Sequence, residues 1–187
     1  MTASRRLITH FDPTGDGPWQ VVRMKTVVGS PLQPIDQLSV VERDLDSTPR
    51  DAEWPLRGVS SYGRYVTLLE RRALEAQQPP LGRPEATCAA LIPITKSATW
   101  WDMAQDERRT ILEERSAHIA TGQQYLPAIA RRLYQSRDLG EPFDFVTWFE
   151  YAPADAQIFE DLVSTLRSTE EWRYVEREVD IRLQRSL

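Results

Sequence analysis

Three segments in the C-terminal half of the chain have the residue patterns of β-strands, and together they restrict the chain to few fold classes. Residues 87–96 are apolar almost throughout, as expected for a strand that is buried on both faces. Residues 143–150 alternate between two faces, with Thr147 and Phe149 on the same one. In residues 175–183, mostly apolar side chains alternate with acidic and basic ones. These patterns predict strands of one antiparallel sheet.

Helices are expected between these strands. The longest covers residues 100–121, with His118 in its last turn and Gly122 as a natural C-cap. Pro127 suits the first turn of a second helix that runs to about Arg137. An amphipathic helix is expected over residues 154–167. The resulting order of elements predicts an α+β fold, with helices on one face of the sheet.

The N-terminal half looks like a shortened version of this pattern, although it contains no sequence repeat. Its expected elements are strands over residues 5–11, 19–28 and 58–67, helices over residues 34–43 and 68–78, and a loop over residues 44–56. The proline-rich segment 79–84 ends the last of these helices. It is either a linker between the two halves or a loop at the edge of a pocket.

The charge of the chain limits its partners. With a formal net charge of −5, it has no broad cationic field to hold a nucleic acid or an anionic membrane. A small anion could still be drawn to a single arginine inside a pocket. The hydrophobic share of 41% and the charged share of 27% are ordinary for a soluble globular protein.

The N-terminus carries no recognisable export signal, because residues 1–11 lack the apolar core of a signal peptide. No run approaches the roughly 18 apolar residues of a membrane span. We therefore expect a cytoplasmic protein, with the periplasm left open. The single cysteine, Cys88, rules out an internal disulfide and a cysteine-rich metal site, and is expected to be a small buried hydrophobe.

Histidine chemistry is narrowly limited, because His10 and His118 are the only two histidines. A histidine on an apolar helix face is more often a core residue than a ligand. Three local features favour a ligand for His118: the last turn of a helix, the nearby Gly122, which leaves room for a flat group, and the apolar side chains expected opposite. The residues alone thus predict a soluble α+β domain with one histidine that could hold a metal cofactor.

Taken singly, the other candidates have ordinary structural interpretations. Trp100 and Trp101 fit a core or a subunit interface. Helical spacing does not decide which of two adjacent arginines would face a pocket. The chain has no glycine-rich phosphate loop and no HExxH motif. A solvated position is the default for Arg131, Arg132, Lys96 and the pair Glu170–Glu171.

In combination, however, the segments resemble the chlorite dismutase family of haem proteins, and most of all its short-chain bacterial lineage with a truncated N-terminal half. The resemblance covers about residues 16–185. The combination is specific to the family, whereas no single stretch is. The matching stretches are residues 56–59 (LRGV), 82–83 (GR), 89–94 (AALIPI), 96–97 (KS), 100–103 (WWDM), 118–131, 141–151, 169–172 (TEEW) and 179–182 (VDIR).

The resemblance implies a proximal side of a haem site. His118 matches the axial ligand of the haem iron, and Glu171 matches the carboxylate that accepts the imidazole N–H. Lys96 matches the basic residue of the same network. Of Trp100 and Trp101, one would pack beside the haem and the other would support the subunit interface.

The resemblance also implies a distal side. Arg131 matches the cationic group on the opposite face of the haem, and Gln78 matches a glutamine that can hydrogen-bond it. Coproheme decarboxylases of the same superfamily lack that arginine, so its presence here favours chlorite chemistry. Residues matching the distal wall are Leu126, Thr147 and Phe149.

For the whole chain, the resemblance implies a dimeric α+β barrel of two ferredoxin-like halves. A single domain would cover residues 1–187, with the shortened half over about 1–80 and the haem-binding half over about 85–187. The implied cofactor is haem b, and the implied reaction converts chlorite to chloride and dioxygen through a ferryl and hypochlorite intermediate. A homodimer is implied, without nucleic acid or membrane as a partner. A haem peroxidase and a haem-binding or haem-transfer protein are alternatives on the same scaffold.

Overall fold

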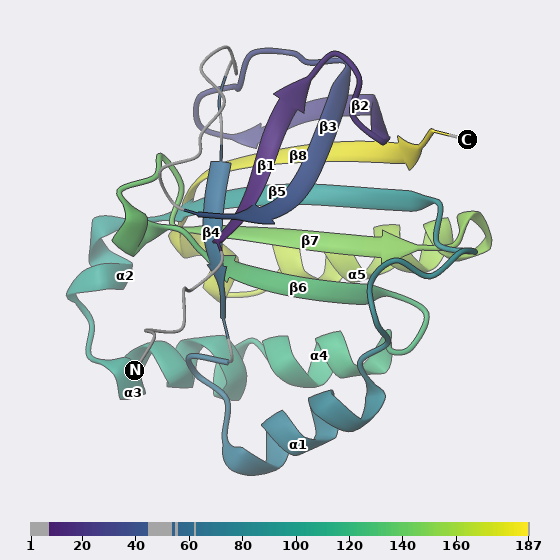
Figure 1. Cartoon of the computed structure of the whole chain (residues 1–187). Coiled ribbons are helices and arrows are strands. Elements are labelled where there is room, and N and C mark those ends of the chain that lie inside the picture. Colours follow the sequence, from purple (N-terminus) through teal and green to yellow (C-terminus); the bar gives the residue numbers. More distant parts are fainter. Residues whose placement is uncertain (1–7, 45–53, 55, 62, 187) are drawn as a thin grey trace, which may run out of the picture.

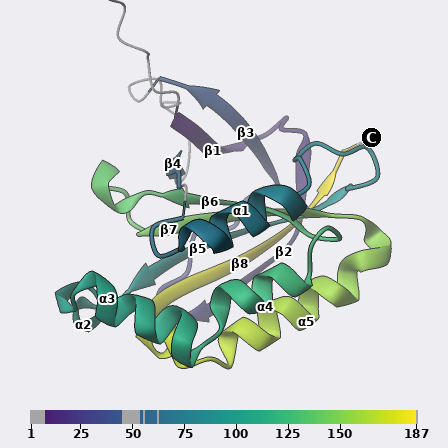
Figure 2. The ribbon, with the colours of Figure 1, turned by 90° about the horizontal axis from the view of Figure 1, so that it is seen from below.

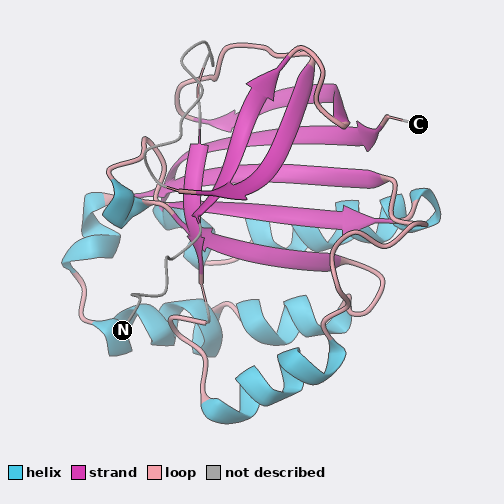
Figure 3. Ribbon diagram, in the orientation of Figure 1, coloured by secondary structure: helices cyan, strands magenta, loops and turns pink. Residues whose placement is uncertain are grey.

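The computed structural model describes residues 8–44, 54, 56–61 and 63–186. Within these residues, eight strands close into an antiparallel barrel in the order β1-β3-β2-β8-β5-β7-β6-β4. The helices lie outside the barrel: α1, α3 and α4 gather below it in Figure 1, and α5 lies behind it. Figure 3 separates the strand layer from the helices that flank it. The prediction of an α+β barrel fold is confirmed.

The C-terminal half has a ferredoxin-like order of elements. Helical segments connect its first two strands and its last two, which gives the succession βαββαβ. In the sheet these strands lie in the order β8-β5-β7-β6, so β5 and β7 are central. The four strands are β5 (Cys88–Lys96), β6 (Ala130–Gln135), β7 (Phe145–Tyr151) and β8 (Val175–Arg185).

Helices of this half cover one face of its sheet. Figure 2 shows α4 and α5 running side by side beneath the strands. No helix among the described residues is long and apolar enough to cross a membrane. The segments are α2 (Ala98–Asp102), α3 (Gln105–Arg109), a π-helix (Thr110–Arg115), α4 (His118–Gln124) and α5 (Ala156–Arg167), with 3-10 turns at Arg137–Leu139, Pro153–Asp155 and Glu171–Tyr174.

The described part of the N-terminal half contains four strands and one helix. α1 begins where predicted, because Thr67 and Glu70 form a capping box in which each side chain accepts the other's backbone N–H. Residues 5–7 of the expected first strand and most of the expected loop 44–56 lie outside the described residues. The elements are β1 (Ile8–Thr14), β2 (Trp19–Val28), β3 (Gln37–Arg43), β4 (Leu56–Ser60) and α1 (Leu68–Gln77).

Two apolar clusters pack against the two faces of the C-terminal sheet. The barrel interior holds residues such as Phe11, Leu91 and Trp148, all at most 1% exposed. The outer face packs against α5 through side chains such as Phe149 and Phe159. Because side chains alternate along a strand, β7 contributes to both clusters, as its sequence predicts. The outer face of this sheet is therefore where a site can form beneath the helices.

Two predictions in the N-terminal half are wrong. Within residues 34–43, Gln37–Arg43 form β3 rather than a helix: β3 pairs with β1, with Phe11 opposite Val40, and Leu38 is fully buried. This long-range pairing outweighs the helical spacing of the apolar residues. The strand expected over residues 58–67 ends early, at Ser60. A positive φ of 77° at Gly63 then turns the chain away from the sheet.

The helix expected from Pro127 to Arg137 is also wrong, because residues 130–135 form β6. β6 pairs with β7 along its whole length, with Arg131 opposite Phe149 and Leu133 opposite Thr147. Tyr134, at 2% exposure, points into the barrel interior. The pairing with β7, and not the spacing of the apolar residues, therefore decides the conformation of this segment.

The single helix expected over residues 100–121 is divided. Met103 and Ala104 are extended and separate α2 from α3, and Ala117, with a φ of 48°, separates the π-helix from α4. The Glu113 carboxylate then caps α4, because its oxygens accept the N–H groups of Ile119 (2.6 Å) and Ala120 (3.2 Å). His118 consequently begins a helix instead of ending one.

Candidate functional site

A cavity of about 360 Å³ lies between the outer face of the C-terminal sheet and the surrounding helices. This volume is within the range of small-molecule and cofactor sites, roughly 300–1,000 Å³. Alternate residues of β5 and β7 form one wall, and α1, α4 and α5 contribute to the others. Most of the wall is apolar. Its titratable or cationic side chains are Lys96, His118, Glu171, Glu178, Glu75, Tyr65 and the arginines 64, 71, 131 and 132.

His118 lines this cavity, and its ring is fixed by Glu171. The Nδ1 atom lies 2.6 Å from Glu171 Oε2, although the two residues are 53 positions apart in the sequence. Because a carboxylate accepts, the imidazole donates from Nδ1 and keeps the lone pair of Nε2 free for a metal. The carboxylate, and not the C-terminal dipole expected from the sequence, orients this ring.

Lys96 completes a buried charged group with these two residues, which we term the histidine cluster (His118, Glu171 and Lys96). Lys96 Nζ lies 2.6 Å from Glu171 Oε1. The solvated positions expected by default for Lys96 and Glu171 are wrong, since they are only 4% and 3% exposed. Burial by itself would raise the pKa of the Glu171 carboxyl, but the charges and hydrogen bonds of His118 and Lys96 outweigh it and hold that pKa at about 2.

Two further contacts hold the histidine cluster in place. The backbone N–H of Glu171 donates to Ser116 Oγ at 2.9 Å, which ties the turn carrying the carboxylate to the residues just before His118. The Lys96 ammonium lies 4.6 Å from the centre of the Trp100 ring and 5.5 Å from that of Trp172. Aromatic faces thus cover the side of the ammonium that the carboxylate leaves open.

Arg131 lines the same cavity from β6 and is arranged quite differently. Among the described residues, no side chain or backbone group pairs with its guanidinium. Burial alone therefore lowers its pKa from the ordinary arginine value. The structure also decides what spacing left open: Arg131 is half-buried, whereas Arg132 is exposed at the cavity mouth. An arginine with five unpaired N–H donors in an apolar cavity is suited to bind an anion.

The structure brings some of the predicted distal residues to the cavity and leaves others outside it. Thr147 and Phe149 form part of its wall, as does Gln78. The Gln78 amide, however, donates to Pro79 O at 3.5 Å, and no hydrogen bond joins it to Arg131. Leu126 is half-buried before the cis Leu126–Pro127 bond and is not among the residues that line the cavity.

The two adjacent tryptophans have different surroundings. Trp100 is 1% exposed and lines the cavity. Trp101 lies outside it, stacks on Phe145 with ring centres 5.8 Å apart, and donates its Nε1–H to Asp144 Oδ2 at 3.0 Å. Their assignment to a haem contact and a subunit contact is compatible with these positions but stays a prediction.

The cavity fits a haem in three respects. The Nε1–H of Trp100 is buried without a hydrogen-bond partner, as a donor to a carboxylate such as a haem propionate would be. Within the described residues, no three His, Cys, Asp or Glu side chains gather as a metal site. His118 would therefore be the sole side-chain ligand, which suits an iron whose other ligands come from a porphyrin. The walls are apolar, as a porphyrin requires.

Sequence reasoning assigned no role to three residues that support this site, Asp144, Trp172 and Glu178. Asp144 accepts from the backbone N–H of Lys96 (2.7 Å) and from the Trp101 indole, and so links β5 to α2. Trp172 donates to Glu178 Oε2 at 2.8 Å. Asp144 directly precedes β7 and Glu178 lies in β8, each next to apolar residues, and a carboxylate at such a place is a usable signal of a buried partner.

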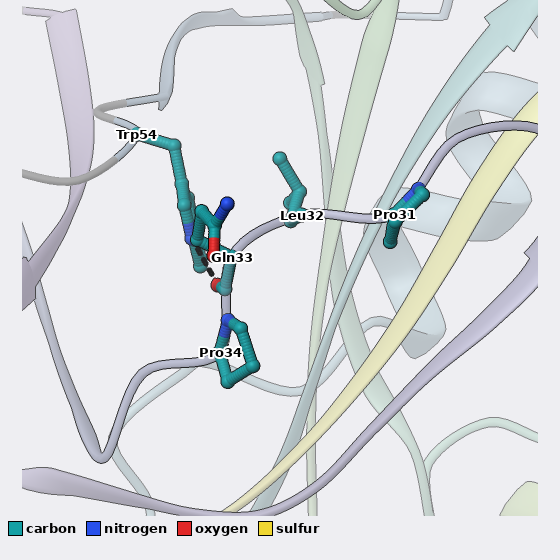
Figure 4. Close-up of a pocket in the computed structure, with 5 residues that line it drawn as sticks. All are labelled: Pro31, Leu32, Gln33, Pro34 and Trp54. Carbon is teal, nitrogen blue, oxygen red and sulfur yellow. Dashed lines mark hydrogen bonds between the residues drawn. The ribbon is translucent and has the colours of Figure 1, made fainter.

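A second hollow lies on the N-terminal half, lined by Pro31, Leu32, Gln33, Pro34 and Trp54. Figure 4 shows Trp54 folded against this segment, with its Nε1–H donating to Gln33 O at 2.6 Å. None of its lining residues is titratable, and the one indole donor is already satisfied. This hollow therefore offers no chemistry that compares with that of the cavity beneath the sheet.

Comparison with known proteins points to a family of enzymes, in agreement with the presence of the cavity and its histidine cluster. The family model described as chlorite dismutase matches residues 35–186. A curated chlorite dismutase of Ideonella dechloratans is 33% identical over 86 residues, which are 46% of this chain and 28% of that relative. The matched stretch thus spans less than a third of the length of this relative.

Solved structures are similar along nearly the whole chain. A crystal structure of dimeric chlorite dismutases from Nitrobacter winogradskyi is 54% identical, with a TM-score of 0.88, and the match covers 95% of this chain and 99% of that one. A mutant chlorite dismutase from Candidatus Nitrospira defluvii is 20% identical, with a TM-score of 0.71 over 98% of this chain and 93% of its own. The second likeness concerns the fold alone.

Proposed function

The chain belongs to the chlorite dismutase family, and we propose that it is a haem-dependent enzyme that converts chlorite to chloride and dioxygen. The observation that carries this proposal is a single cavity lined by two complementary groups. One is His118, with Nδ1 tied to a buried carboxylate and Nε2 free. The other is Arg131, a cation without a counter-charge among the described residues. A metal-holding base and an anion-binding cation are what this reaction requires.

The residues that would hold the haem are those of the histidine cluster, together with Trp100. His118 would bind the iron through Nε2, and Glu171, by accepting the Nδ1 proton, would make the imidazole a stronger donor. Lys96 would keep Glu171 ionised. The Trp100 indole would donate to a carboxylate of the cofactor. When bound, the haem iron would supply the redox chemistry that breaks chlorine–oxygen bonds and joins two oxygen atoms.

Arg131 would act on the anions of the reaction. Its N–H groups would bind chlorite with charge-assisted hydrogen bonds and hold a transient chlorine oxyanion until dioxygen has formed. Thr147 and Phe149 would keep water from this part of the cavity, which strengthens the electrostatic attraction. A retained oxyanion would damage the protein less than one that escapes.

We also propose a homodimer as the functional assembly. The support is the relative described as dimeric, which aligns with 95% of this chain at 54% identity. Sedimentation at several protein concentrations tests this directly: a mass near twice the chain mass of 21.6 kDa is expected, and a monomer at all concentrations contradicts it.

Dioxygen evolution tests the proposed activity. The protein is reconstituted with haem and mixed with chlorite in a closed oxygen-electrode cell. An immediate burst of dioxygen is expected from the wild type, with none from His118→Ala. His10→Ala is the matched control, because His10 is the other histidine and is fully buried in β1, away from the cavity.

Other outcomes would favour the alternatives. Haem absorption without dioxygen would contradict the proposed reaction and favour a haem-binding or haem-transfer protein. Oxidation of an organic dye by hydrogen peroxide, again without dioxygen from chlorite, would favour a peroxidase. Failure to bind haem at all would contradict each of these functions.

A further inference from the structure

Gly122 lies inside α4, four residues and therefore about one helical turn beyond His118. Its φ is not in the left-handed region, so the backbone does not require glycine. Glycine is also the least favoured residue, apart from proline, inside a helix. A buried glycine at this place therefore needs another reason, and it does not serve as the C-cap that the sequence suggested.

The surroundings of Gly122 supply that reason. A Cβ atom placed on it would lie 3.1 Å from Arg131 Nη1, 3.5 Å from Cζ and 3.7 Å from Nη2. The three nearest neighbours of the missing side chain are thus all atoms of one guanidinium. At 3.1 Å the contact is closer than side chains normally tolerate, so a methyl group would push the guanidinium away.

Other buried or half-buried arginines in the described part of the protein have partners: some pair with carboxylates, and others, such as Arg108 and Arg177, donate to backbone carbonyls. Arg109 donates twice to the Glu70 carboxylate, at 2.8 and 2.6 Å, and Arg182 donates to Glu160 at 2.6 Å. Arg131 differs, because no carboxylate, carbonyl or hydroxyl oxygen in the described part of the chain accepts from its guanidinium. Its place is set by a surface of matching shape on α4. An arginine held in this way keeps its N–H donors free for a ligand.

We propose that Gly122 is a positioning residue for Arg131: its missing side chain lets the guanidinium rest on α4, at the height where it meets a small oxyanion in the cavity. This inference rests on the proposed function of Arg131 as the anion-binding group. It adds that one short helix, α4, sets the positions of two groups in the cavity, the His118 imidazole and the Arg131 guanidinium. Its first residue presents the imidazole, and its fifth seats the cation.

Anion affinity is the readout that a purely structural role would not move. Nitrite serves as a probe, because it is a bent oxyanion like chlorite, and its binding is followed by the absorption of the haem-loaded protein. Gly122→Ala is expected to raise the Kd for nitrite about three- to tenfold, as the hydrogen bonds to the guanidinium lengthen. The same variant is expected to melt at a higher temperature, because alanine favours the helix.

A double-variant cycle assigns the effect to the contact. In an Arg131→Ala background, Gly122→Ala should change the nitrite Kd by less than about twofold, because no guanidinium remains to be displaced. Gly15→Ala is the matched control, since a Cβ there would meet nothing within 4 Å. A wild-type Kd in Gly122→Ala would overturn the proposal, as would an equal loss in both backgrounds.

A crystal structure of the Gly122→Val protein without cofactor gives a test that needs neither haem nor chlorite. The Arg131 guanidinium is expected to move off α4 by a shift clearly above the positional error, while the His118–Glu171 contact stays in place. An unmoved guanidinium would refute the positioning role even if chlorite turnover is established. A displaced guanidinium would support it even if the protein has another reaction.

Discussion

The histidine cluster and Arg131 both line the cavity, and the protein holds them in place by opposite means. In the histidine cluster, Lys96 and His118 share one buried carboxylate, with both contacts at 2.6 Å. On the other side, Arg131 has only the bare backbone of Gly122 beneath its guanidinium. The first arrangement uses charge pairing to fix geometry. The second uses shape, and leaves the charge available.

This difference separates a supporting role from a binding role. A buried ion pair is rigid, because breaking it leaves an uncompensated charge in a medium of low polarity. A buried cation without a partner is costly to the fold, and it is retained where an anion will complete it. Substitution in the histidine cluster should therefore lower mainly the stability of the fold, whereas substitution of Arg131 should impair mainly the handling of anions.

The largest effect on stability is expected from Glu171→Gln. This change leaves the Lys96 ammonium buried without its counter-charge, so the free energy of unfolding should fall by about 3 kcal/mol. Haem affinity should fall by roughly 10- to 100-fold, because a neutral amide oxygen replaces the anionic carboxylate that accepts the Nδ1 proton of the imidazole. Urea unfolding and haem titration measure the two losses.

The neighbouring Glu170 supplies the control for this change. Glu170 pairs with Arg115 at 3.1 Å, and both side chains are about a third exposed or more. Glu170→Gln should therefore cost no more than about 1 kcal/mol. If the two variants lost equal stability, the histidine cluster would not be the rigid element that its geometry implies.

A different outcome is expected for Arg131→Ala. Because this guanidinium has no partner to lose, the free energy of unfolding should change by less than about 1 kcal/mol. Catalysis should suffer instead: some turnover remains, but more hypochlorite escapes and the enzyme inactivates sooner. The measurements are thermal unfolding, a hypochlorite trap and the total dioxygen formed before activity is lost.

Arg132→Ala is the matched control for the arginine, since Arg132 is adjacent and exposed. It should leave both stability and total dioxygen close to wild type. An Arg131→Ala enzyme as durable as the wild type would refute oxyanion retention. A large loss of stability in that variant would refute the idea that Arg131 is held by shape alone.

The smallest effect on stability is expected from a change in α1. This helix contributes to the cavity wall, but none of its residues is buried. The hydrogen bonds from Arg109 lower the pKa of Glu70 to about 2, from an ordinary value of 4.5. A carboxyl with a lowered pKa stabilises the fold above its unfolded-state pKa. That contribution is therefore complete above about pH 4.5 and is lost as the pH falls towards 2.

Glu70→Gln should accordingly cost about 1 kcal/mol at neutral pH, a modest value because the pair is partly exposed. The difference from wild type should shrink as the pH is lowered from about 4.5 to 2, which unfolding measurements across that window would detect. Glu75→Gln, whose partner Arg71 is 3.7 Å away and half-exposed, is the control. A difference that persists unchanged at low pH would contradict the assignment.

Local sequence patterns predicted the elements in which neighbours in the chain decide the conformation. The apolar run of β5, the alternation of β7 and β8 and the capping box of α1 are all visible within a few residues. The N-terminal division near residue 80 and the cytoplasmic location stay predictions. The two strands that were predicted as helices lie where pairing with another strand decides the conformation: β3 and β6 have helix-like spacing but are held by long pairings with β1 and β7.

The candidate site follows the same rule. Local features favoured His118 as a ligand, but Arg131 and Glu171 were selected by family resemblance alone, because a solvated position was the default for each. Their burial could not be predicted from neighbours in the sequence, because the contacts that cause it span 53 residues to His118 and 75 to Lys96. Gly122 was predicted as a cap, since its true neighbour, Arg131, lies on another element.

By itself, the sequence determined three of the four strands of the C-terminal sheet (β5, β7 and β8), two of the helices and the residue types that a haem site would use. Only the tertiary structure decided that His118 begins its helix, that Lys96 and Glu171 are buried as a pair, and that Arg131 rather than Arg132 is half-buried in the cavity. The physical reason is that these interactions act over different separations along the chain. Backbone propensity acts within a turn or a strand, whereas burial, and with it the pairing of charges, is set by segments that meet only when the barrel closes.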